Sequence, residues 1–195
     1  MGQTGYKNCA NEREWKLAKQ EASNCYKTFA AEIKKVKKEK KGITANNIKS
    51  WLKCSANFLG CFAEDELQNL SVTSFPSFLI VNIDPSNLAG SHWIAIGIFS
   101  EKIEIFDSLG FDLFNWSRIP CTLINFLNRL AVTRKVFTAP RIQSSKSHLC
   151  GFYAIYYVIM RNFTSFEKTY SCFCKKFSRN EFFLHNMHTR LQCIF

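Results

Sequence analysis

Apolar positions in the N-terminal region recur at helical spacing. From Trp15 to Val36 they fall every three or four residues, which predicts one long amphipathic helix that starts near residue 11 and runs into a lysine-rich segment. Gly42 ends this helix, and residues 44–47 predict the turn and cap of a second, short helix through Trp51. The first 53 residues are therefore predicted to be a helical extension.

Beyond residue 53, short continuous apolar runs predict strands. They occupy residues 78–83, 92–99, 103–106 and 135–138. The second and third runs are separated only by the turn at 100–102, so we expect them to form a hairpin.

Three further segments predict helices in this part of the chain. One starts at Pro120, and a second, 150–160, is apolar on all sides, as a buried helix is. Ser178 and Glu181 have capping-box spacing, which predicts a C-terminal helix that opens after Glu181. The chain is therefore assigned to the α+β class, with a central mixed sheet packed on helix 150–160 in a domain that spans 54–195.

Charge is distributed unevenly between the two parts. The net charge is +11, and residues 1–53 hold 13 Lys and Arg against 5 Asp and Glu, whereas residues 54–195 hold 13 against 10. Clustered lysines favour a polyanion, because counterion release drives binding to DNA whatever its base sequence. A solvated helix face or a nuclear localisation signal would show the same pattern. The candidate DNA-binding residues are Lys34, Lys35, Lys37, Lys38, Lys40 and Lys41.

Composition narrows the class of protein. A chain of 195 residues that is 47% hydrophobic has enough apolar material for a core of its own, so it is not mainly disordered. No apolar stretch approaches the roughly 20 residues of a membrane helix, and no apolar signal-peptide core lies near the start. We therefore expect an intracellular protein with no membrane partner. Nine cysteines, an odd count, are expected to be mostly reduced core residues.

One cysteine lies where a nucleophile is favoured. Cys150 begins the predicted buried helix, where unpaired backbone N–H groups and the helix dipole stabilise a thiolate. His92 starts one strand of the predicted hairpin and Asp107 follows the other, so both are expected at one edge of the sheet, as general base and orienting acid. Taken singly, Cys150 reads more simply as a core residue and His92 as a packing residue.

Other residues complete this candidate site. Gln143 lies seven residues before Cys150, and its side-chain amide is expected to donate to an oxyanion together with the Cys150 N–H. Trp93 and Gly151 neighbour the two reactive residues in sequence, and we expect them beside the substrate or the oxyanion. His148 is assigned to the rim of the site.

The order His, Asp, Gln, Cys-Gly on strand, strand, loop and helix resembles the adenain-like cysteine peptidases, the family of the adenovirus protease. Their clan also contains the SUMO and NEDD8 (Ulp-type) proteases. The resemblance covers roughly residues 57–160 and rests on four segments: Phe58–Gly60, Gly90–Trp93, Phe106–Phe111 and Gln143–Gly151.

The resemblance implies a papain-like-clan fold and an endopeptidase that cuts precursor (capsid or core) proteins of a virus or virus-like element. Its sites would contain small residues such as Gly, the chemistry would need no cofactor, and the protein would act in the host cell nucleus or the virion. The family's viral member is activated by DNA and by a peptide disulfide-linked just upstream of the oxyanion glutamine. Because residues 132–142 contain no cysteine and Cys121 is the nearest, only activation by DNA is carried over.

One departure from the family concerns the third member of the triad. Adenain-like enzymes often have Glu where this chain has Asp107, and either carboxylate is able to orient His92.

Two other functions are consistent with the sequence. A protease that removes ubiquitin-like modifiers would use the same residues. A DNA-binding structural protein on a decayed protease fold would use only the basic extension, but a complete set of four site residues argues against decay. A loose zinc pattern, Cys172-Phe173-Cys174 with His185 and His188, is weighed against reduced cysteines and surface histidines, and no metal is expected. The oligomeric state is left open.

Overall fold

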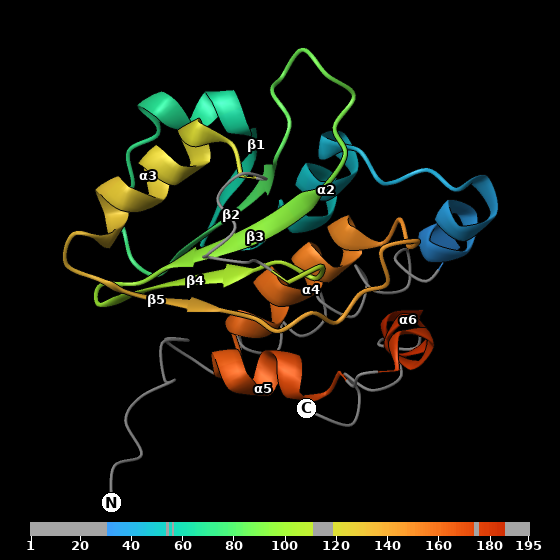
Figure 1. The fold of residues 1–195 in the computed structure, drawn as a ribbon. Helices are drawn as coiled ribbons and strands as arrows, with labels where there is room; N and C mark the ends of the chain where they lie inside the picture. The colour runs from blue at the N-terminus through green and yellow to red at the C-terminus, as the bar shows by residue number, and fades with distance from the viewer. Residues whose placement is uncertain (1–30, 54, 56, 111–118, 174–175, 186–195) are drawn as a thin grey trace, which may run out of the picture.

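The protein's computed structural model describes residues 31–185 except 54, 56, 111–118, 174 and 175. Figure 1 shows a sheet with helices on both of its faces. Residues 31–39 are helical. The elements that follow are α2 (Ala45–Leu52), β1 (Phe58–Ala63), the 3₁₀ helix η1 (Glu64–Asn69), β2 (Ser77–Asn82), β3 (Trp93–Ile98), β4 (Lys102–Phe106), α3 (Cys121–Ala131), β5 (Lys135–Thr138), α4 (Cys150–Arg161), α5 (Phe166–Ser171) and α6 (Phe177–His185).

The five strands form one sheet in sequence order, β1-β2-β3-β4-β5. The central strands β2, β3 and β4 are antiparallel, whereas β1 runs parallel to β2 and β5 parallel to β4. This confirms the predicted α+β class with a central mixed sheet and the predicted hairpin of β3 and β4. None of the helices in the described residues is both long enough and apolar enough to span a membrane.

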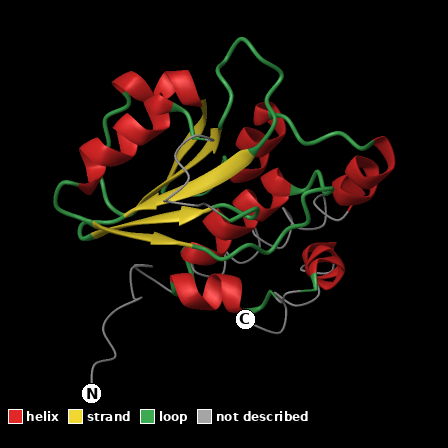
Figure 2. Cartoon of the chain, viewed as in Figure 1, coloured by secondary structure: helices red, strands yellow, loops and turns green. Residues whose placement is uncertain are grey.

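Helices cover both faces of the sheet, which explains why the strands read as continuous apolar runs. In β2, Phe78 and Ile80 belong to the core on the α4 side, whereas Leu79 and Val81 belong to the core beneath α3 and η1. Successive side chains point to opposite faces of a strand, so a strand buried on both sides has no polar positions to alternate with. Figure 2 shows the two helical layers on either side of the yellow strands.

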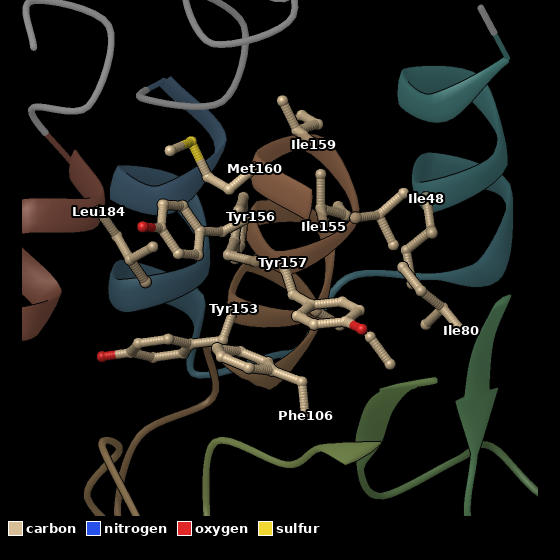
Figure 3. Packing of buried hydrophobic residues seen from close by; sticks show 14 of the residues in the cluster. Ile48, Ile80, Phe106, Tyr153, Ile155, Tyr156, Tyr157, Ile159, Met160 and Leu184 are labelled. Carbon is tan, nitrogen blue, oxygen red and sulfur yellow. The ribbon is translucent and has the colours of Figure 1, made fainter. Parts of the chain in front are cut away.

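The helix that begins at Cys150 is the centre of the larger core. Every residue of α4 is buried, as predicted. Figure 3 shows its side chains pointing in several directions, toward Ile48 of α2 and Leu184 of α6 as well as toward the sheet. On the sheet side, the ring of Tyr157 stacks on Phe106 with 5.0 Å between the centroids. This packing fixes α4 against β3 and β4. His92 directly precedes β3, and Asp107 directly follows β4.

Residues 31–52 pack into the same core as the rest of the protein. Ile33, Val36 and Ile48 are buried in the cluster around α4, and Thr44 caps α2 with a capping box completed by Asn47, as predicted for this turn. Residues 31–52, the described part of the predicted extension 1–53 except Lys53, therefore contribute to the core that surrounds α4. The earlier part of the predicted N-terminal helix, including Trp15, lies outside the described residues.

Other elements differ from the sequence predictions. The C-terminal helix α6 starts at Phe177, so Ser178 and Glu181 lie inside it and do not form a capping box at its start. Instead, the Glu181 carboxylate pairs with Lys37, 3.0 Å away. The strand β1 was not predicted because Gly60, at φ 146, and a bulge next to it interrupt the apolar pattern. Neither η1 nor α5 was predicted.

Candidate active site

The edge of the β3–β4 hairpin brings His92 and Asp107 together. His92 immediately precedes β3 and Asp107 immediately follows β4, and Nε2 of the imidazole lies 2.7 Å from Oδ1 of the carboxylate. The same Oδ1 accepts the backbone N–H of Leu109 at 2.8 Å, which fixes the direction of the carboxylate. Because Nε2 is taken by Asp107, the other ring nitrogen, Nδ1, is left to face a third group.

That third group is the thiol of Cys150. Cys150 is the first residue of α4 and is 7% exposed. Burial alone would lower the pKa of His92, but the hydrogen bonds and charges of Asp107 and Cys150 outweigh it and raise that pKa to about 10. The raised pKa favours the protonated imidazole, which lies between a carboxylate on one side and a sulfur atom on the other.

The N-terminus of α4, at Cys150, has backbone N–H groups that make no intrahelical hydrogen bond. Leu149 is the N-cap residue of α4, and its side chain makes no capping hydrogen bond. Its carbonyl oxygen accepts the N–H groups of Phe152 and Tyr153 at 2.9 and 3.1 Å. The earlier N–H groups, on Cys150 and Gly151, come before the first intrahelical acceptor, so they and the helix dipole are directed at the site of the sulfur.

Gln143 is buried in the segment that leads to α4. Its Oε1 accepts the hydroxyl of Ser108, and its Nε2 donates to the carbonyl of Ser147 at 2.8 Å. The backbone N–H of Gln143 also donates to the Ser108 carbonyl at 2.8 Å. The amide is therefore oriented with its N–H side toward the loop before Cys150. The role of Ser108 was missed, since the only sequence signal was its position directly after Asp107.

Trp93 and Gly151 meet at a residue that sequence reasoning also missed, Ile43. The indole Nε1 of Trp93 donates to the Ile43 carbonyl at 3.0 Å. A Cβ atom at Gly151 would lie 2.5 Å from Ile43 Cγ1 and 3.1 Å from Trp93 Cδ1, so only glycine lets the start of α4 approach so closely. Both residues thus position the N-terminus of α4. His148 is exposed, as expected for the rim of the site.

The remaining candidates are placed as follows. The six lysines between residues 34 and 41 are all exposed, and Lys37 forms the ion pair with Glu181 described above. Among the other cysteines, Cys61 is a poor nucleophile because burial raises the pKa of its thiol to about 12. Within the described part of the chain, no three His, Cys, Asp or Glu side chains are grouped to hold a metal ion. Cys174 and His188 lie outside that part.

Comparison with known proteins shows a likeness among solved structures. No protein-family profile matches the chain, and no curated protein matches its sequence. Among solved structures, it is similar to the crystal structure of the selenomethionine form of the ASFV pS273R protease, with a TM-score of 0.47 and 20% sequence identity over 77% of this chain and 68% of that one.

Proposed function

We propose that this protein is a cysteine endopeptidase in which His92, Asp107 and Cys150 form the catalytic triad. The observation that carries the proposal is the arrangement of His92 between the Asp107 carboxylate and the Cys150 sulfur, at the uncapped N-terminus of α4. Three groups of these types in this order are what nucleophilic thiol catalysis requires: a nucleophile, a base and a group that orients the base.

The chemistry follows from the protonation states. The raised pKa of His92 favours the imidazolium, so the proton that the Cys150 thiol gives up is held on Nδ1 before the reaction, and the resulting thiolate attacks the substrate carbonyl. A carbon–sulfur bond forms while the carbonyl oxygen becomes an oxyanion. When the tetrahedral intermediate collapses, the carbon–nitrogen bond breaks and Nδ1 returns its proton to the leaving amine. Water then hydrolyses the thioester, with His92 accepting and returning a second proton.

Gln143 and the start of α4 would stabilise the oxyanion. Ser108 and Ser147 hold the Gln143 amide in one orientation, and the second N–H of that amide is the donor we assign to the oxyanion. The backbone N–H of Cys150 is the other donor. Donors that are oriented before the reaction cost no reorganisation during it, which is why such groups act mainly on the transition state.

The substrates that we propose are precursor proteins of a virus or virus-like element, cut at sites with small residues such as Gly. The support is the resemblance of four sequence segments to adenain-like peptidases; three of them, Gly90–Trp93, Phe106–Phe111 and Gln143–Gly151, contribute residues to the site just described. Asp107 takes the place of the Glu that is frequent in that family, and its 2.7 Å contact with His92 is that of an orienting carboxylate.

A labelling experiment and a cleavage experiment test the proposal. A peptide vinyl sulfone that ends in Gly should modify Cys150, and mass spectrometry of the labelled protein should show no comparable label on the exposed Cys121. Purified protein should also cut candidate capsid precursors, and the Cys150→Ala variant should not. Release of a ubiquitin-like modifier, with precursors left intact, would favour the deconjugating alternative. A folded protein that neither cleaves nor is labelled at Cys150 would rule out a peptidase.

A further inference from the structure

A cavity of about 370 Å³ lies against the loop that leads into the catalytic helix. One wall comes from Val36, Lys37 and Lys40 of the basic N-terminal segment, and the other from residues 146–149, which end next to Cys150. Its volume is at the lower end of the range for small-ligand sites, which suits a single side chain or a short stretch of peptide rather than a duplex.

The walls join an apolar floor to a basic rim. Val36 and Leu149 are buried and supply apolar surface. The charged groups are Lys37, Lys40, Lys146 and Glu181, with the imidazole of His148 beside them. Since the ion pair with Glu181 occupies Lys37, the ammonium groups of Lys40 and Lys146 give the cavity its net positive charge. An aliphatic stem that ends in a carboxylate complements such a cavity.

The backbone at Lys40 gives independent reason to look for a role of its side chain. Lys40 follows the helix of residues 31–39 and has φ 53, the left-handed conformation that glycine adopts at many helix C-termini. A residue with a side chain is less stable than glycine in this conformation, because its Cβ approaches the following carbonyl oxygen too closely. A lysine at this point therefore costs stability while it places an amine at the cavity.

The cavity is connected to the catalytic groups. Its wall residue Ser147 accepts the hydrogen bond from Gln143 at 2.8 Å, and Leu149 is the N-cap residue of the helix that starts at Cys150. On the other wall, the position of a Cβ at Gly42 is 3.9 Å from the His148 carbonyl oxygen, so the basic segment packs directly on this loop. The lining of the cavity therefore includes Leu149, the residue directly before Cys150 in the chain.

We propose that this cavity is a specificity subsite that binds an acidic side chain, Asp or Glu, of the peptide substrate near the cleaved bond. The inference rests on the proposed peptidase function and adds a charge preference to it. It also separates the lysines of the basic segment by role, because Lys37 and Lys40 line the cavity whereas Lys35 and its other exposed neighbours do not.

Matched fluorogenic peptides test the subsite. Each contains a Gly cleavage site, and the members of a pair differ only by Asp against Asn, or Glu against Gln, at one position on either side of it. At the position that enters the cavity, kcat/KM is expected to be about tenfold higher for the acidic peptide, since two lysines contribute modest partly exposed ion pairs. Lys40→Gly and Lys146→Gln should each move this ratio toward one, and Lys35→Gln should leave it unchanged.

Lys40→Gly is suited to this test because glycine favours the backbone conformation found there, so loss of folding is not expected. Calorimetric titration of the Cys150→Ala variant with the same peptides gives a second measurement that needs no turnover.

Equal cleavage of acidic and neutral peptides would overturn the subsite but not the peptidase function. A preference that survives both lysine variants would overturn its location. A short DNA duplex that binds the protein and loses affinity in both lysine variants, with no preference among peptides, would make the cavity a polyanion site instead. Cleavage of no peptide and no labelling of Cys150 would refute the peptidase and, with it, the subsite.

Discussion

The two ends of α4 each join the helix to β4 through a buried carboxylate, but the two clusters differ in how fully they are hydrogen-bonded. At the C-terminal end, Glu104 accepts the hydroxyl of Tyr157 at 2.9 Å, and Arg161 donates to it through Nε at 2.6 Å and Nη2 at 3.1 Å. Lys102 adds a fourth contact, at 2.8 Å. Both carboxylate oxygens of Glu104 are saturated by these donors, and none of the donor groups faces a nucleophile.

At the N-terminal end the carboxylate of Asp107 holds a group that is itself reactive. His92 has one nitrogen on Asp107 and the other toward Cys150, and the first N–H groups of α4 remain without an intrahelical acceptor. Carboxylate, cation and helix terminus are present at both ends. The N-terminal end is the candidate for catalysis because its backbone N–H groups remain available to a substrate. The cluster at Glu104 has no such free hydrogen-bonding groups to offer, since its carboxylate is saturated.

The strongest test of this difference removes the reactive atoms. Cys150→Ala and His92→Ala should each abolish cleavage of a Gly-containing peptide, because one removes the nucleophile and the other its base. The midpoint of urea unfolding should change little in Cys150→Ala, since a thiol at a helix start contributes little packing. Cys121→Ala, at an exposed cysteine, is the matched control and should keep full activity. Turnover by either of the first two variants would remove the triad assignment.

Asp107→Asn should reduce kcat/KM by roughly 10²- to 10⁴-fold, because the amide no longer stabilises the imidazolium or selects its orientation. The same change should move the alkaline limb of the pH profile. In the native protein this limb is expected near pH 10, the pKa of His92. In the variant this limb should move to a lower pH, because burial lowers the pKa of His92 and the charge of Asp107 no longer raises it. An unmoved limb would show that another group holds His92.

The raised pKa also has a consequence for folding stability. The folded-state pKa of His92, about 10, lies above the ordinary value of 6.5. The stabilisation from the protonated imidazole is therefore complete below about pH 6.5 and is lost as the pH rises through about 10.

The opposite cluster should respond in stability rather than in catalysis. Glu104→Ala leaves Arg161 buried without its carboxylate, which is expected to cost about 3–5 kcal/mol of unfolding free energy. Urea denaturation measures this cost, and Glu101→Gln, in the exposed turn between β3 and β4, is the control with no expected effect. The molecules that remain folded should keep their kcat. A large loss of kcat with unchanged stability would mean that the two ends are not separable.

Gln143→Ala should lower kcat by roughly 10²- to 10³-fold with little change in KM, because its donor acts chiefly in the transition state. Ser108→Ala should give a smaller loss of the same kind, since it removes only the hydrogen bond that orients the amide. A change confined to KM would make Gln143 a substrate-binding residue.

The local parts of this site could be predicted from the sequence, and the non-local parts could not. The turn at 100–102 fixes the hairpin, and the hairpin alone places His92 and Asp107 at one edge. By contrast, the contact of Ile43 with Trp93 and Gly151 depends on how a distant segment packs on α4, and no periodic pattern carries that information. The parallel pairing of β1 with β2 was missed for a similar reason, because Gly60 breaks the pattern locally and the partner strand lies across a long connection.

The late position of α4 in the chain has an effect on biosynthesis. All five strands precede it, so a ribosome completes the sheet before the helix that covers one of its faces. Until Cys150 and the rest of α4 have emerged, His92 lacks the sulfur beside it, and β3 lacks the helix that packs on it. A nascent chain therefore lacks the proposed triad, and in that interval it exposes apolar surface of the kind that chaperones bind.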